Sequence, residues 1–218
     1  MTDPLKVQQD YWNREADAFD RIYSQKKSAV SVWLDKVFRK DMFQRFAFTI
    51  EHCRPIEGRR FLDVGCGNGL YSIELARNGA ERVVGIDIAE KMLDACRELA
   101  AQEGVTQRCS FHHTDLLAYE PGSTFDVAIG IGLFDYIADP LPVLKKIRQL
   151  TTGKVIASFP RFWTWRAPVR KLRLGLRGCP VYFFTRRRLR AMFADAGFAS
   201  VNITRVGKLH CVVATCEQ

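Results

Sequence analysis

Glycines that follow a predicted strand are the first residues of this sequence that could bind a ligand. The apolar strand Phe61 to Val64 runs directly into Gly65, Gly67 and Gly69, and apolar residues at helical spacing follow at once. Glycine lets the backbone turn sharply and approach a ligand closely, and the start of a helix offers free N–H groups to an anionic group. The stretch therefore predicts a strand, a ligand-binding turn and a helix.

Three carboxylates accompany this turn at predicted strand ends. Asp63 lies in the last residues of the first strand, Asp87 closes a second strand over Arg82 to Ile86, and Asp115 follows a third. Asp87 comes eighteen residues after Gly69, close to the ~20-residue spacing at which an acidic residue meets a ribose. Turn and acids in this order indicate a nucleotide-type cofactor site, and a structural turn without a ligand is the less favoured alternative.

The pattern LDVGCGNG followed by GIDIAEKML resembles the class I, Rossmann-like S-adenosylmethionine (SAM) methyltransferases. The third glycine comes one residue too early for the G-x-G-x-x-G fingerprint, which disfavours a nicotinamide cofactor. The resemblance covers residues 61 to about 159. It implies SAM as cofactor and S-adenosylhomocysteine as its product.

The same resemblance implies where the cofactor lies. The ammonium group of the methionine part would lie at Asp63, both ribose hydroxyls would donate to Asp87, and the adenine amine would donate to Asp115. The other expected cofactor contacts are Tyr11, Gly65, Gly67, Ile88, Met92, Leu116, Gly130 and Ile131.

Methyl transfer requires little chemistry from the protein, because the sulfonium is already a reactive electrophile. Positioning of the acceptor does most of the work, and a general base is needed only if the acceptor must lose a proton. Asp135 and Tyr136, in the segment GLFDYIADP after the fourth predicted strand, are expected to line the acceptor pocket.

The segments FDRIY, LFDYIADP and ASFPRFW resemble those of the magnesium-protoporphyrin O-methyltransferases. The catalytic tyrosine of that family corresponds to Tyr23. Where that family has a histidine before the tyrosine after strand four, this chain has Asp135. The departure favours a related small-molecule methyltransferase that transfers to oxygen or nitrogen.

The order of predicted elements indicates an α/β fold. Five strand and helix alternations predict a doubly wound sheet, and the family resemblance implies seven mostly parallel strands with an antiparallel last strand. We expect one domain, with a helical N-terminal lid over residues 1–55, a SAM-binding core over 56–160, and a basic aromatic insert with the C-terminal strands over 161–218. Tyr11, Trp12 and Tyr23 are candidate lid residues.

The net charge of +9 comes from one segment, since residues 161–190 hold ten basic residues and no acid. A pocket for an anionic substrate and a solvated surface with its aromatics in the substrate cavity are the favoured interpretations. Contact with an anionic membrane surface comes next. RNA binding is less favoured, because no RNA-binding motif accompanies the charge.

Several classes of function are disfavoured by absent motifs. No acidic cluster suggests a metal, the N-P-P-Y motif of nucleic-acid amino methylation is missing, and seven cysteines without a C-x-x-C pair support neither zinc nor a disulfide framework. The N-terminus lacks a signal pattern and no stretch is long enough to span a membrane, so a cytoplasmic protein is expected. An RNA methyltransferase and a SAM-binding regulator without transfer activity remain the alternatives.

Overall fold

The computed structural model describes residues 6, 8–13, 42–161 and 181–216 of the chain. Tyr23 and most of the basic aromatic segment, residues 162–180, lie outside the described residues.

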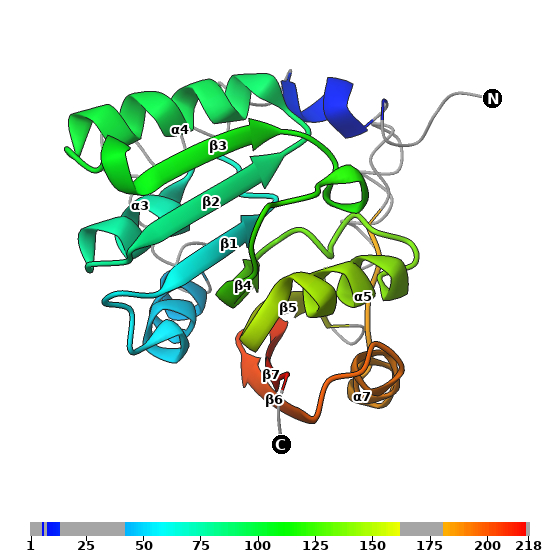
Figure 1. The fold of residues 1–218 in the computed structure, drawn as a ribbon. Helices are drawn as coiled ribbons and strands as arrows, with labels where there is room; N and C mark the ends of the chain where they lie inside the picture. The colour runs from blue at the N-terminus through cyan, green and yellow to red at the C-terminus, as the bar shows by residue number, and fades with distance from the viewer. Residues whose placement is uncertain (1–5, 7, 14–41, 162–180, 217–218) are drawn as a thin grey trace, which may run out of the picture.

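The described strands form one seven-stranded sheet in the order β3-β2-β1-β4-β5-β7-β6 (Figure 1). Their bounds are β1 Arg60–Val64, β2 Arg82–Asp87, β3 Cys109–His113, β4 Phe125–Gly130, β5 Thr151–Pro160, β6 Ser200–Val206 and β7 Leu209–Thr215. Strands β1 to β5 pair in parallel, and β7 is antiparallel to both β5 and β6. The predicted doubly wound sheet with an antiparallel last strand is therefore confirmed.

Helices cover both faces of this sheet. Their bounds are α3 Leu70–Arg77, α4 Glu90–Gln102, α5 Leu141–Leu150 and α7 Arg186–Asp195, with 3-10 turns at Thr106–Arg108 and Leu116–Ala118. Residues 8–13 and 42–53 are helical as well. Thr185 caps the last helix, since its hydroxyl accepts from the backbone N–H of Arg188 at 3.3 Å.

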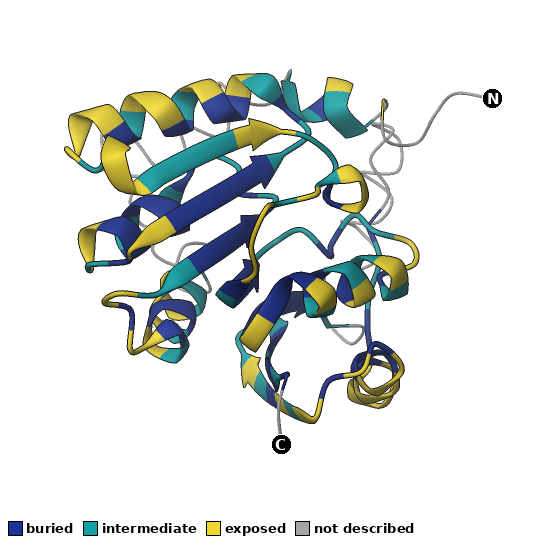
Figure 2. Ribbon diagram, viewed as in Figure 1, coloured by how far each residue is buried: buried dark blue, intermediate teal, exposed yellow. Residues whose placement is uncertain are grey.

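Alternating strand residues divide the core between the two faces. On β1, Phe61 packs with α3 and the helix over 42–53, whereas Leu62 and Val64 pack into the larger cluster that α5 and α7 cover. The central strands are buried on both sides (Figure 2). Because parallel strands end at the same edge, the carboxyl ends of β1, β2, β3 and β4 bring their following turns together.

An aromatic cluster fixes the segments next to this edge on the β5 side. The Phe159 ring lies 4.5 Å from that of Phe134, 5.2 Å from Phe184 and 5.9 Å from Phe193. All four side chains are fully buried. The cluster therefore joins β5, the loop after β4, the segment before α7 and α7 itself.

We predict that Phe159→Ala lowers the free energy of unfolding by about 3 to 5 kcal/mol, because it opens a cavity among these rings. Phe43→Ala is the matched control, since Phe43 is 64% exposed, and should change stability by less than about 0.5 kcal/mol. Urea denaturation followed by circular dichroism measures both. Equal effects of the two substitutions would show that the cluster does not stabilise the fold as described.

Candidate active site

The glycine turn after β1 adopts a backbone that larger residues would strain. Gly65, Gly67 and Gly69 have φ angles of 67°, 55° and 78°. A Cβ on Gly69 would lie 2.9 Å from the Cys96 sulfur. The Cys96 thiol also donates to the carbonyl oxygen of Gly67 at 3.0 Å, so α4 supports the turn from behind. The turn is thus held open towards the edge of the sheet.

The Asp87 carboxylate, at the end of β2, accepts two backbone hydrogen bonds. Its Oδ2 accepts from the N–H of Gly67 and its Oδ1 from the N–H of Ala89, each at 2.9 Å. Burial raises the pKa of Asp87, while these N–H donors oppose that shift. Each carboxylate oxygen can accept a further hydrogen bond. The carboxylate therefore has the capacity to bind two neighbouring hydroxyl groups.

Asp63 lies behind the turn rather than in it. Its side chain is 1% exposed, and its Oδ2 accepts from the Ser72 hydroxyl at 2.7 Å. Burial, the largest cause, raises the pKa of Asp63 to about 7 despite that hydrogen bond. The Asp63 carboxyl therefore gains or loses its proton near neutral pH.

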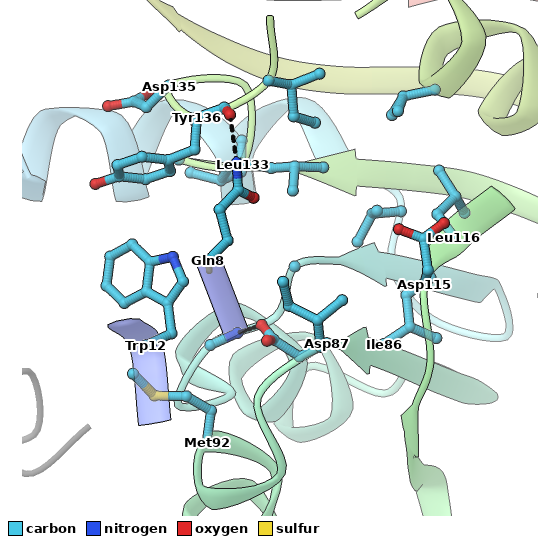
Figure 3. Close-up of a pocket in the computed structure, with 18 of the residues that line it drawn as sticks. Gln8, Trp12, Ile86, Asp87, Met92, Asp115, Leu116, Leu133, Asp135 and Tyr136 are labelled. Carbon is cyan, nitrogen blue, oxygen red and sulfur yellow. Dashed lines mark hydrogen bonds between the residues drawn. The ribbon is translucent and has the colours of Figure 1, made fainter. Parts of the chain in front are cut away.

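A cavity of about 350 Å³ opens between the glycine turn and the loop after β4 (Figure 3). Five predicted cofactor residues from the β1 and β2 ends line it: Gly65, Gly67, Asp87, Ile88 and Met92. Further round the wall lie three more from the β3 and β4 ends: Asp115, Leu116 and Ile131. The Asp115 carboxylate also accepts from the N–H of Leu117 at 2.7 Å, which fixes its position. Eight predicted cofactor residues thus share one cavity.

The two predicted acceptor residues of the described chain line the same cavity. Asp135 is 5% exposed, and its carbonyl oxygen accepts from the N–H of Tyr182 at 2.8 Å. The Tyr136 ring meets the Trp12 ring edge to face at 5.1 Å. A buried acid and an aromatic residue from the loop after β4 therefore belong to the same cavity wall as the glycine turn.

Three predicted cofactor residues lie outside the cavity wall. Asp63 is behind the turn, and Tyr11 is buried where it packs with Trp12 and Val181. Gly130 is enclosed, since a Cβ there would lie 3.0 Å from the Phe134 ring. Tyr23 lies in the part of the chain that the structure does not describe.

The short helix over residues 8–13 closes one side of the cavity. The Gln8 side-chain N–H donates to the carbonyl oxygen of Tyr136 at 2.8 Å. Trp12 packs against Ala89 and Met92 on one side and against Tyr136 on the other (Figure 3). This helix therefore connects the cofactor residues with the acceptor residues.

Sequence reasoning missed several residues of the site. Gln8 lies one helical turn before Trp12, so the i, i+4 spacing could have indicated it. Arg45 and Met42 line the cavity from the helix over 42–53, which lies in the predicted N-terminal lid, but neither was a candidate site residue. Ser72 and Cys96 looked like ordinary helix residues, and only their hydrogen bonds show that they support the turn.

Residues 56–179 match the family described as "Methyltransferase domain". That match covers more than half of the chain, and the chain therefore belongs to the methyltransferase domain family. The prediction of a class I SAM-dependent methyltransferase, made from the glycine turn and its acids, is confirmed.

Curated relatives match a part of the chain. The ubiquinone biosynthesis O-methyltransferase of Ruegeria pomeroyi is 43% identical over 98 residues, which cover 44% of this chain and 38% of that protein. The enzyme of that name from Parvibaculum lavamentivorans is 36% identical over 102 residues, covering 46% of this chain and 39% of that protein. The chain thus matches less than half the length of these relatives.

Among solved structures, magnesium protoporphyrin IX methyltransferase from Synechocystis PCC 6803 with bound S-adenosylhomocysteine is similar over nearly the whole chain. The TM-score is 0.78 at 25% identity, and the alignment covers 96% of this chain and 98% of that one. This agrees with the resemblance seen in the segments around the predicted core.

The described residues contain neither a membrane-spanning helix nor a group of side chains that could hold a metal ion. None of the described helices is long and apolar enough to cross a membrane. Within the same residues, no three His, Cys, Asp or Glu side chains gather as a metal site would require.

We predict a pH dependence of stability from Asp63. Its pKa in the folded protein, about 7, exceeds the ordinary value of 3.8, so between these values the folded state holds a proton that the unfolded state has released. The free energy of unfolding should therefore fall as pH rises across this window, by a few kcal/mol.

Urea unfolding at several pH values measures the effect, and Asp63→Asn should remove this part of the dependence. Asp94→Asn is the control, because the Asp94 side chain is 61% exposed. A wild-type profile that Asp63→Asn leaves unchanged would contradict the prediction.

Proposed function

We propose that the chain transfers the methyl group of SAM to an oxygen atom of a small-molecule acceptor. The observation that carries the proposal is the single cavity, whose wall contains the glycine turn and Asp87 as well as Asp135 and Tyr136. Its volume of about 350 Å³ is within the range of small-molecule sites. The oxygen is inferred from the relatives, which are named O-methyltransferases.

The cofactor half of the cavity has the donors and acceptors that SAM requires. Asp87 has capacity for the two ribose hydroxyls, Asp115 is placed for the adenine amine, and Met92 offers an apolar surface. The open glycine backbone at Gly65 and Gly67 allows close approach of the methionine part. When bound, SAM supplies the electrophilic methyl group.

Asp63 is proposed to act on the cofactor through the turn. Its carboxyl is buried behind Gly65 with a pKa near neutrality. An ammonium group at the turn would favour the charged carboxylate. Asp63 would then offset the positive charge of the methionine part without touching the acceptor.

The acceptor half is proposed to orient a hydroxyl group and remove its proton. The Asp135 carboxylate is buried in the cavity wall, where it can accept that proton as the oxygen attacks the methyl group. Tyr136 and Trp12 form an aromatic side suited to a flat or apolar acceptor. Tyr23, the counterpart of a catalytic tyrosine by resemblance, remains a candidate for the same half.

We infer that the helix over residues 8–13 acts as a lid. It contacts Met92 through Trp12 and the Tyr136 backbone through Gln8, so its position depends on both halves of the cavity. Closing this side excludes water, which strengthens hydrogen bonds to the reacting groups.

Asp87→Ala is predicted to weaken the binding of S-adenosylhomocysteine by at least about tenfold, because hydrogen bonds to a charged acceptor are each worth ~1.5 to 3 kcal/mol. Calorimetry measures the affinity. Asp94→Ala, an exposed acid of α4, is the control and should bind as the wild type does. Unchanged affinity for Asp87→Ala would contradict the assignment of the ribose site.

Asp135→Asn is predicted to lower turnover by about 10² to 10⁴ while S-adenosylhomocysteine affinity stays nearly constant. The assay follows labelled methyl from SAM into pooled small phenolic compounds and, in parallel, into RNA. Asp139→Asn is the control, since Asp139 is exposed in the same loop. Label in RNA alone would favour the RNA alternative, and cofactor binding with no transfer at all would favour the regulator.

A further inference from the structure

A group of arginines lies at the β5 and β6 side of the sheet edge, outside the cavity. Arg161 follows β5, Arg205 lies on β6 and Arg186 begins α7. Between them lies His210 of β7, which pairs with Phe159 on one side and Arg205 on the other. Paired residues of neighbouring strands point to the same face, here the face that α7 covers.

Hydrogen bonds fix two of these arginines to the β6–β7 hairpin. The Arg161 guanidinium donates to the carbonyl oxygen of Gly207 at 3.2 Å, and that of Arg186 donates to the carbonyl oxygen of Ile203 at 3.0 Å. Each bond uses one of the five N–H groups of a guanidinium. The other N–H groups of these two side chains make no hydrogen bond to the described residues.

Within the described part of the chain, the three arginines have no ion-pair partner. No carboxylate among the described residues forms an ion pair with Arg161, Arg186 or Arg205. The sequence from 161 to 216 contains a single acid, Asp195, which lies at the far end of α7. Residues 162–180 therefore add positive charge and no carboxylate, wherever they lie.

The start of α7 adds a second feature that is unfavourable without a bound anion. Three arginines in succession, Arg186 to Arg188, occupy its first turn, where the helix dipole disfavours cations. The Thr185 cap satisfies the N–H of Arg188, whereas the first two N–H groups of a helix have no partner within it. Such N–H groups bind anions.

His210 supplies the independent observation that a ligand belongs here. His210 is 7% exposed, and its Nδ1 is buried with no hydrogen-bond partner among the described residues. Buried polar atoms in native proteins nearly always have a partner, and an exception requires an explanation. An anion bound at the arginines would offset the positive charge that they place around this buried imidazole.

We propose that Arg161, Arg186 and Arg205, with His210 and the first turn of α7, form a binding site for a phosphate group. Guanidinium groups bind phosphate in bidentate geometry, and its oxygens can accept from three guanidinium groups more readily than the two oxygens of a carboxylate can. The phosphate belongs either to a free phosphorylated molecule or to a lipid headgroup, since both present the same chemistry. The proposal is independent of methyl transfer.

Binding should be visible at His210 itself. Burial first, and then the charges of Arg161, Arg186 and Arg205, lower the pKa of His210 to about 4. A bound phosphate offsets those charges, so the pKa of His210 should rise when inorganic phosphate replaces chloride at equal ionic strength. The full chain with isotope-labelled histidine, without SAM, allows this titration to be followed by NMR.

The variant Arg186→Gln/Arg205→Gln removes two exposed side chains of the site. It should weaken phosphate binding by about tenfold or more, and it should raise the pKa of His210 in chloride alone. The control Arg54→Gln/Arg77→Gln removes the same charge at the opposite edge of the sheet and should bind phosphate as the wild type does.

Vesicles identify the source of the phosphate. Retention on phosphatidylglycerol but not phosphatidylcholine vesicles, lost in Arg186→Gln/Arg205→Gln, assigns a lipid headgroup. Binding of inorganic phosphate without vesicle retention assigns a free phosphorylated ligand. A His210 signal that responds equally to phosphate and chloride, or a control variant that binds as weakly as the test variant, overturns the proposal.

Discussion

The shape of the cofactor side of the cavity depends on two hydrogen bonds that the Asp87 carboxylate accepts. By accepting from Gly67 and Ala89, it ties the turn after β1 to the end of β2 and to the start of α4. The turn after β1 is built on glycines and therefore has few side chains to hold its shape. One charged group therefore positions two backbones, and it keeps spare acceptor capacity for a ligand.

The acceptor side is held by packing instead. Phe134, immediately before Asp135, is stacked on Phe159 in the core, and the Asp135 backbone is bonded to Tyr182. The loop that carries the proposed base is thus fixed from the α5 and α7 face, while Trp12 and Gln8 contact it from the other direction. This arrangement fixes the backbone of Asp135 at the cavity wall.

Much of this organisation could be predicted from the sequence, and the reasons are local. Apolar runs that end in acids indicated strands and their ligand edge, and the glycine spacing indicated the type of turn. The position of Asp63 behind the turn, and not in the cavity wall, could not be predicted. Strand alternation shows which face of the sheet a side chain is on, but not which other residues separate it from the cavity. The support by Cys96 and Ser72 likewise depends on how helices pack.

Contacts between residues far apart in the chain could not be predicted from the sequence either. Gln8 and Tyr136 are separated by 128 positions, and no periodicity relates them. The arginines around His210 come from the end of β5, from β6 and from the start of α7, so the sequence showed a basic segment but not where these charges gather. Charge composition indicates an anionic partner, and only the register of β5, β6 and β7 places the group that would bind it.

A crystal structure of the full chain with S-adenosylhomocysteine tests the central claim most directly, that one cavity holds both cofactor and acceptor. The account predicts the ribose hydroxyls on Asp87, the adenine amine at Asp115 and the sulfur facing Asp135 and Tyr136. A ligand bound elsewhere, or one whose sulfur faces away from Asp135, would contradict it.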